Sequence, residues 1–200
     1  MQFSKRKSSS HGKAASVALL LIDVINDLNF DDADALLRQA LPMARHLEHL
    51  KREASRLQIP TIYVNDNFGQ WKSDFRQTVE HCCGPNSRGA EISRTLHPAE
   101  SDYFVLKPKH SGFYATTLEL LLEHLQVDTL ILTGIATNIC VLFTANDAYM
   151  RDYKLFVPSD CVAANTPDET EYSLLQMKNI LKADIRQSAE MDLKAFRNHG

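Results

Sequence analysis

The chain has 200 residues, of which 44% are hydrophobic, and its formal net charge is -3 at pH 7. That length and apolar content are enough for one substantial hydrophobic core, so we expect a single domain. The slightly acidic balance argues against a nucleic-acid-binding surface. The four cysteines form no paired spacing of the disulfide or zinc type, which favours a reduced, cytoplasmic compartment.

The first 15 residues, which include MQFSKRKSSSHGK, are polar and rich in Ser and Lys. This composition is typical of a flexible tail. The apolar segment that follows, VALLLID, is too short to span a membrane and no small-residue cleavage site follows it. We therefore expect a flexible tail over residues 1–15, one domain over residues 16–200, and no membrane partner.

Apolar segments of strand length alternate with segments of helical period along the rest of the chain. Several of them, such as VALLLI and TLILT, are apolar at nearly every position, which is typical of strands buried on both faces. This alternation predicts an α/β domain with a parallel sheet and crossover helices. The strands are predicted at residues 17–23, 61–65, 103–107, 129–133, 155–158 and 183–185.

The helices are predicted from apolar residues that recur every three or four positions. Pro42 interrupts the first of these patterns, so we expect a short helix up to about Ala40 and a longer one that starts near Pro42, where proline is tolerated. Further helices are predicted over residues 114–124, from Thr137 onward, and over residues 167–181.

Charged and polar residues stand at the ends of otherwise apolar strands. Asp23 ends the first predicted strand, Lys107 ends the third, and Gly134 follows the fourth, six residues before Cys140. Ligands of parallel sheets bind beyond the carboxyl ends of the strands, and a buried charge is costly unless it is paired. We therefore expect Asp23, Lys107 and Cys140 to share one cleft.

Cys140 lies in the stretch TGIATNICV, in the first turn of a helix that Thr137 is expected to cap. The unpaired amides and the dipole of such a turn favour a thiolate and can hold an oxyanion. A thiol also needs a base, and Asp23 held by Lys107 can serve, with the ammonium lowering the thiol pKa. A cysteine in a helix is also a common core residue, so a structural role stays open here.

Histidine is the usual base for a catalytic cysteine, but none of the eight histidines ends a predicted strand. The nearest candidate is His110, three residues after Lys107. It can face either the cleft or solvent, and we favour solvent.

Three motifs, LLLIDVINDL, LKPKHSGF and GIATNICV, resemble the isochorismatase-like cysteine hydrolase family in their order and separation. The resemblance covers about residues 17–185. The family pattern has an aspartate at the end of the first strand, a lysine shortly before a Ser-small-Phe element, and a cysteine six residues after a glycine. Asp23, Lys107 and Cys140 match these positions one by one.

The resemblance implies a three-layer α/β/α sandwich with a six-stranded parallel sheet, in a homodimer or homotetramer. It implies a cis peptide bond between Ile135 and Ala136, and an oxyanion hole formed by the backbone amides of Ala136 and Cys140. The implied activity is hydrolysis of a small amide or carbamoyl compound. Asp23 takes the proton of Cys140, the thiolate attacks the carbonyl carbon, and Lys107 keeps the aspartate charged. Asp23 then protonates the departing amine, and water hydrolyses the thioester.

Relatives that hydrolyse nicotinamide carry a metal site with an Asp-x-His element after the second strand. The corresponding stretch here is VNDNFGQW, in which Phe68 stands where the histidine would be, so we expect no metal and no other cofactor. Apolar walls with a few polar anchors are typical of a substrate pocket. The residues predicted to line it, each of which can instead pack a lid or a subunit contact, are Phe30, Asn67, Trp71, Phe113, Tyr114 and Ile135.

Two other functions stay open. One is hydrolysis of a vinyl ether such as isochorismate, in which a carboxylic acid does the chemistry and which survives the loss of Cys140. The other is a non-catalytic protein that binds a ligand or partner in the same cleft. A dinucleotide-binding fold is excluded, because IDVINDL stands where a glycine-rich turn would follow the first strand.

Overall fold

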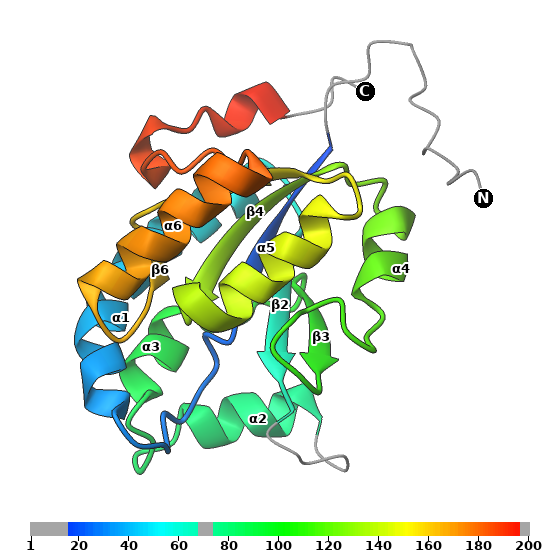
Figure 1. Ribbon diagram of the computed structural model, residues 1–200. Coiled ribbons are helices and arrows are strands. Elements are labelled where there is room, and N and C mark those ends of the chain that lie inside the picture. The colour runs from blue at the N-terminus through cyan, green and yellow to red at the C-terminus, as the bar shows by residue number, and fades with distance from the viewer. Residues whose placement is uncertain (1–15, 68–73, 197–200) are drawn as a thin grey trace, which may run out of the picture.

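The computed structural model of the protein describes residues 16–67 and 74–196, so the tail predicted over residues 1–15 lies outside the described residues. The described residues form a parallel sheet covered by helices on both faces (Figure 1). The predicted fold class, an α/β/α sandwich with a six-stranded parallel sheet, is confirmed.

The sheet has the order β3-β2-β1-β4-β5, and β6 also pairs with β4. The chain adds β2 and β3 on one side of β1 and then crosses to add β4 on the other side, and such a switch point is where ligands bind in this class of sheet. The central strand VALLLI is buried at all positions. The strands are β1 (Val17–Ile22), β2 (Thr61–Asp66), β3 (Tyr103–Lys107), β4 (Thr129–Ile135), β5 (Lys154–Phe156) and β6 (Val162–Ala163).

The sixth strand was predicted in the wrong place. Residues 183–185 make only an isolated bridge, in which Asp184 pairs with Phe156 of β5. The side chain of Asp184 binds Arg186, which closes the segment locally. The sixth strand is instead β6, a two-residue strand inside VPSDCVAA that is too short to produce a periodic pattern.

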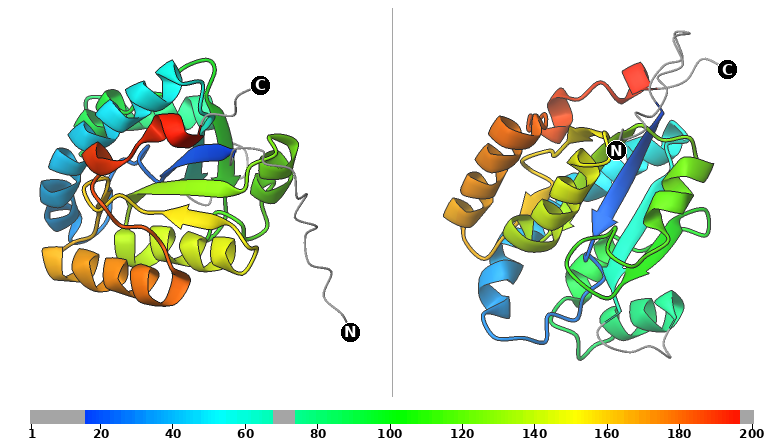
Figure 2. Two further views of the ribbon diagram at one scale, coloured as in Figure 1. Left: turned by 90° about the horizontal axis from the view of Figure 1, so that it is seen from above. Right: turned by 45° about the vertical axis from the view of Figure 1, so that its right-hand side comes forward.

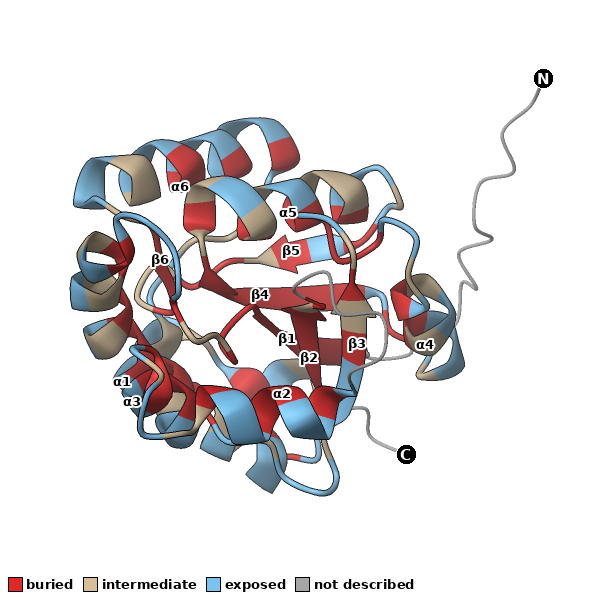
Figure 3. Ribbon diagram, turned by 90° about the horizontal axis from the view of Figure 1, so that it is seen from below, coloured by how far each residue is buried: buried red, intermediate tan, exposed pale blue. Residues whose placement is uncertain are grey.

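Helices α1, α2 and α3 pack on one face of the sheet, and α4, α5 and α6 pack on the other (Figure 2). Figure 3 shows the buried residues gathered on the strands and on the helix faces that meet them. The prediction for residues 167–181 is confirmed, with Thr166 and Glu169 capping the helix start reciprocally. The helices are α1 (Ala33–Arg56), α2 (Phe75–Cys82), α3 (Ala90–Thr95), α4 (Leu118–His124), α5 (Leu142–Tyr149) and α6 (Pro167–Leu181).

Pro42 does not divide the first helical segment, contrary to prediction. It lies inside α1 and is exposed, so the carbonyl that loses its amide partner lies on the side that water reaches. Ala40 before it and Met43 and Leu47 after it are all buried in one cluster. Packing of this continuous apolar stripe outweighs the loss of one hydrogen bond.

Two predicted helix starts also differ from the structure. The helix predicted over residues 114–124 begins only at Leu118. The one predicted from Thr137 opens with a π-helical turn, Thr137–Val141, before α5. Turns of this kind are frequent at functional sites.

Candidate active site

Asp23, Lys107 and Cys140 meet at the carboxyl end of the sheet. Asp23 directly follows β1, Lys107 is the last residue of β3, and Cys140 lies in the π-helical turn after β4. Lys107 Nζ lies 2.8 Å from Asp23 Oδ2 and donates to Cys140 Sγ at 3.6 Å. The lysine therefore contacts the carboxylate and the thiol at once.

The carboxylate of Asp23 is held at both oxygens. The backbone amide of Asp66 donates to Oδ1 at 2.7 Å, while Lys107 occupies Oδ2. Asp23 has a left-handed backbone (φ 51°), which aspartate tolerates better than most residues. Only 5% of Asp23 is exposed, so its orientation is fixed by the fold.

Lys107 is fully buried, and its charge is compensated by two carboxylates. Besides Asp23, Asp66 Oδ2 lies 3.7 Å from Nζ. Burial alone would lower the pKa of Lys107, but the charge and hydrogen bond of Asp23, with the charge of Asp66, outweigh it and raise the pKa. Lys107 is therefore protonated at neutral pH.

Lys107 lowers the pKa of the Cys140 thiol, as predicted, but it does not bring that pKa below its ordinary value. Burial raises the pKa of Cys140 to about 12, the charge of Asp23 adds to this rise, and Lys107 offsets it only in part. Burial also raises the pKa of Asp23 above its ordinary value, despite the attraction of Lys107. In the resting site the sulfur keeps its proton, and it shares a hydrogen bond with Asp23.

The junction between β4 and the cysteine turn depends on Gly134. Gly134 pairs with Ile22 of β1 and has φ 107°, a conformation that L side chains rarely adopt. The peptide bond between Ile135 and Ala136, one residue further on, is cis. Thr137 was predicted to cap this turn, but the turn begins after Ala136 instead. The buried Thr137 Oγ1 has no hydrogen-bond partner within the described residues.

Replacing Gly134 with alanine is expected to destabilise the protein strongly. A Cβ there would lie 2.1 Å from the backbone oxygen of Ile22, so β1 and β4 would have to separate. We expect the free energy of unfolding to fall by about 3 kcal/mol or more, measured by urea denaturation. In the matched control Gly84→Ala, the nearest atom would lie 3.0 Å away, at a turn rather than in the sheet. Equal stability of Gly134→Ala and the wild type would contradict this account of the junction.

The loop after β3 is tied to the helix that follows Cys140. The hydroxyl of Ser111 binds the carboxylate of Asp147, and the amide of Gly112 donates to Thr144 Oγ1 at 3.0 Å. Thr144 Oγ1 in turn donates to the carbonyl oxygen of Cys140 at 2.7 Å. The motif LKPKHSGF therefore contributes Lys107 to the site and also fixes the cysteine turn.

Two of the predicted pocket residues are core residues in the structure. The ring of Phe113 is buried against Tyr153, at 5.9 Å between centroids, with the guanidinium of Arg151 over it. Ile135 is 2% exposed and belongs to the core on the other face of the sheet. Their packing accounts for both side chains without a substrate.

The other predicted pocket residues divide into three cases. Asn67 is buried beside the site, and its backbone amide donates to the backbone carbonyl oxygen of Lys107 at 3.1 Å. Phe30 and Tyr114 are surface residues, 44% and 59% exposed. Trp71 lies outside the described residues.

His110 lies next to the sulfur of Cys140, although we predicted that its side chain faces solvent. Its Nδ1 is 3.9 Å from Cys140 Sγ, and its ring lies 5.5 Å from the ring of Phe143, centroid to centroid. The residue is exposed, so it faces solvent and the sulfur together. The loop geometry that brings it back over the cysteine turn has no signature in the sequence.

The loop after Asp23 is shaped by its own polar side chains. Asn26 Oδ1 accepts from the amide of Leu28 at 2.8 Å, and Asp27 Oδ1 accepts from the amide of Asn29 at 3.1 Å. Asn65, fully buried, accepts from the amide of Ile25 and donates to its carbonyl oxygen. These bonds hold the segment that leaves the Asp23 position.

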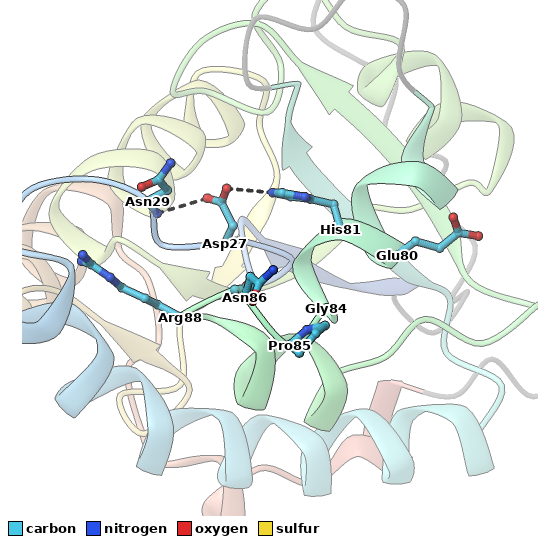
Figure 4. A pocket seen from close by; sticks show the side chains of 9 residues that line it. Asp27, Asn29, Glu80, His81, Gly84, Pro85, Asn86 and Arg88 are labelled. Carbon is cyan, nitrogen blue, oxygen red and sulfur yellow. Dashed lines mark hydrogen bonds and ion pairs between the residues drawn. The ribbon is translucent and has the colours of Figure 1, made fainter.

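A pocket of about 390 Å³ lies beside this loop and was not predicted (Figure 4). Asp27 Oδ2 pairs with His81 Nε2 at 3.0 Å across it, while the side chains of Glu80 and Arg88 point away from this pair. Asp23, Lys107 and Cys140 do not line this pocket.

Within residues 16–67 and 74–196, no group of three or more His, Cys, Asp and Glu side chains is placed to hold a metal ion. Among the described helices, none is long and apolar enough to cross a membrane.

The Isochorismatase domain model matches residues 17–189 of the chain. The isochorismatase family protein YaaI of Bacillus subtilis is 44% identical over 171 residues, which cover 86% of this chain and 93% of that protein. A protein described as a probable inactive nicotinamidase, from Arabidopsis thaliana, is 30% identical over 175 residues, covering 82% and 89%.

Among solved structures, the N-carbamoylsarcosine amidase of Thermoplasma acidophilum superimposes with a TM-score of 0.68 at 26% identity, covering 88% of this chain and 99% of that one. A parallel sheet with this switch point and these matches define the class of protein. The chain belongs to the isochorismatase-like hydrolase family.

Proposed function

We propose that this hydrolase cleaves the C–N bond of a small amide or carbamoyl compound through a thioester on Cys140. The observation that carries the proposal is the position of Lys107 Nζ, 2.8 Å from the Asp23 carboxylate and 3.6 Å from the Cys140 sulfur. A base, a nucleophile and a buried cation in mutual contact are the parts that nucleophilic catalysis requires. Similarity to an N-carbamoylsarcosine amidase supports an amide or carbamoyl substrate.

In the first step, the Asp23 carboxylate takes the proton from Cys140 Sγ as the sulfur attacks the carbonyl carbon. The raised pKa of the thiol means that proton transfer accompanies attack, because a free thiolate is scarce at neutral pH. Lys107 stabilises the negative charge that passes between oxygen and sulfur.

The carbonyl electron pair moves to oxygen as the S–C bond forms, and the amides of Ala136 and Cys140 are the proposed donors to this oxyanion. When the intermediate collapses, the C–N bond breaks and Asp23 gives its proton to the departing nitrogen. The thioester remains on Cys140, and water hydrolyses it to release the acid.

The finer points are also proposals. We expect a cytoplasmic enzyme with a small-molecule substrate and no cofactor. We expect a homodimer or homotetramer, and apolar side chains exposed on α6, such as Tyr172 and Ile180, are suited to a subunit contact. Phe30 and Tyr114 remain candidates for substrate contacts or for that interface.

The proposal is tested with a panel of ureido compounds, carbamoyl compounds and primary amides, scored by ammonia release, with isochorismate as a separate substrate. We expect ammonia from at least one compound in the wild type and none in Cys140→Ala. If the wild type and Cys140→Ala hydrolyse isochorismate equally and neither cleaves an amide, vinyl ether hydrolysis replaces the proposed amide hydrolysis. If neither class is turned over, a non-catalytic binding role, in keeping with the name of the Arabidopsis relative, replaces it.

A further inference from the structure

The sulfur of Cys140 has charged or titratable neighbours on two sides. On the buried side lie Lys107 and Asp23. On the exposed side lies His110, whose Nδ1 is 3.9 Å from Sγ, at the outer limit of a hydrogen bond to sulfur. Phe143 of α5, itself 52% exposed, lies against the imidazole ring. The first step uses only the buried side.

Thioester hydrolysis makes two demands that the first step leaves unmet. A water molecule must lose a proton as it attacks, and the sulfur must leave. A thiol with a pKa near 12 is a poor leaving group as a thiolate, because leaving slows as thiol pKa rises. The sulfur therefore needs a proton as the S–C bond breaks.

Asp23 is badly placed to serve water. Both oxygens of its carboxylate are engaged on the buried side of the sulfur, by the Asp66 amide and by Lys107. It is also 5% exposed. His110 lies on the exposed side of the sulfur, and an imidazole can accept a proton and return it.

We infer that His110 is a further catalytic residue, which serves as the general base and acid of thioester hydrolysis; this rests on the proposed function. Water attacks the thioester carbon while His110 Nδ1 takes one of its protons. The tetrahedral intermediate collapses, the S–C bond breaks, and its electron pair goes to sulfur. The imidazolium then gives the same proton to Sγ, which restores the thiol and neutral His110 and leaves the carboxylic acid product. Asp23 and His110 thus divide the two halves of the reaction.

The test uses p-nitrophenyl acetate, an activated ester whose leaving group needs no protonation. Release of p-nitrophenol measures acetylation, and intact mass spectrometry locates the acetyl group on Cys140. After removal of excess ester, the decay of the acetyl-enzyme measures hydrolysis alone. The variants are His110→Ala and, as a matched control, His124→Ala, an exposed histidine at the end of α4.

In His110→Ala we expect acetylation within about 3-fold of the wild type and deacetylation slowed about 100-fold, the lower range for loss of a general base. Added imidazole should restore deacetylation in His110→Ala, because the vacated position is open to solvent, and should leave the wild type unchanged. His124→Ala should match the wild type in both phases. This pattern separates proton transfer from a merely structural effect, which imidazole would not correct.

Unchanged deacetylation in His110→Ala would overturn the inference and leave the proposed function standing. Equal slowing of both phases would also overturn it, because His110 would then act on the thiol itself. If the wild type takes no acetyl group on Cys140, the thioester mechanism fails, and the inference fails with it.

Discussion

Replacing Cys140 with alanine is expected to abolish amide hydrolysis. The substitution removes the atom that forms the covalent bond, and neither Asp23 nor Lys107 can replace it as a nucleophile in the buried site. Loss of the nucleophile from a hydrolase whose catalytic residues act as a unit typically costs a factor of about 10⁴ or more in turnover. The measurement is the rate of ammonia release under saturating substrate.

The matched control is Cys83→Ala. Cys83 is half-buried like Cys140 but lies at the end of α2, and the charge that acts on its pKa is that of Arg94. We expect its activity to equal that of the wild type. Residual activity in Cys140→Ala within about tenfold of the wild type would show that the sulfur is not the nucleophile.

Replacing Asp23 with asparagine is expected to slow hydrolysis about 10²- to 10⁴-fold, the range for loss of a general acid–base group. Asparagine keeps the shape and can still accept from the Asp66 amide, but it cannot take the thiol proton. Burial, the largest cause of the raised thiol pKa, remains in this variant, so spontaneous ionisation does not replace the base. The measurement is again steady-state ammonia release.

The same substitution has a structural consequence that must be measured separately. Among the described residues, it leaves Asp66, at 3.7 Å, as the carboxylate that compensates the buried ammonium of Lys107. Breaking a buried pair in this way costs about 3 kcal/mol of the free energy of unfolding, which urea denaturation would detect. Activity is therefore compared under conditions in which both proteins are folded.

The control for Asp23→Asn is Asp27→Asn. Asp27 is four residues along the same loop, and asparagine can still accept from the amide of Asn29. It loses the ion pair with the exposed His81, which contributes little to stability. Equal losses of activity in the two variants would mean that the loop, rather than the Asp23 carboxylate, is what matters.

The convergence of the site was predictable because of how parallel sheets are built. Continuous apolar segments marked the buried strands, and the ionisable residues that end the first and third predicted strands had to share the carboxyl edge of the sheet. That reasoning placed Asp23 and Lys107 together, and Gly134 followed by a cysteine turn placed Cys140 beside them. Asp23, Lys107 and Cys140, which are far apart in the chain, could therefore be assigned to one site from the sequence.

Other features were not predictable, because tertiary packing decides them. Pro42 predicts a helix break, yet α1 continues through it because residues on both sides of it are buried in the core. Strand β6 is too short to form a pattern. Lys107 and the helical turn both favour a thiolate, but burial outweighs them and raises the pKa of Cys140. The burial of one side chain cannot be predicted from its neighbours in the sequence.

The central claim is that Asp23 and Lys107 make Cys140 a nucleophile. The most direct test is the rate at which iodoacetamide alkylates each cysteine near neutral pH, followed by peptide mass spectrometry, in the wild type, Asp23→Asn and Lys107→Ala. Cys82 and Cys161 are fully buried, whereas Cys83 is half-buried like Cys140, so exposure alone cannot separate the last two. Because Asp23 takes the thiol proton as the sulfur attacks, we predict that Cys140 reacts much faster than Cys83 in the wild type, despite its raised pKa, and loses that advantage in both variants. A Cys140 that reacts no faster than Cys83, or that is indifferent to both substitutions, would contradict the account.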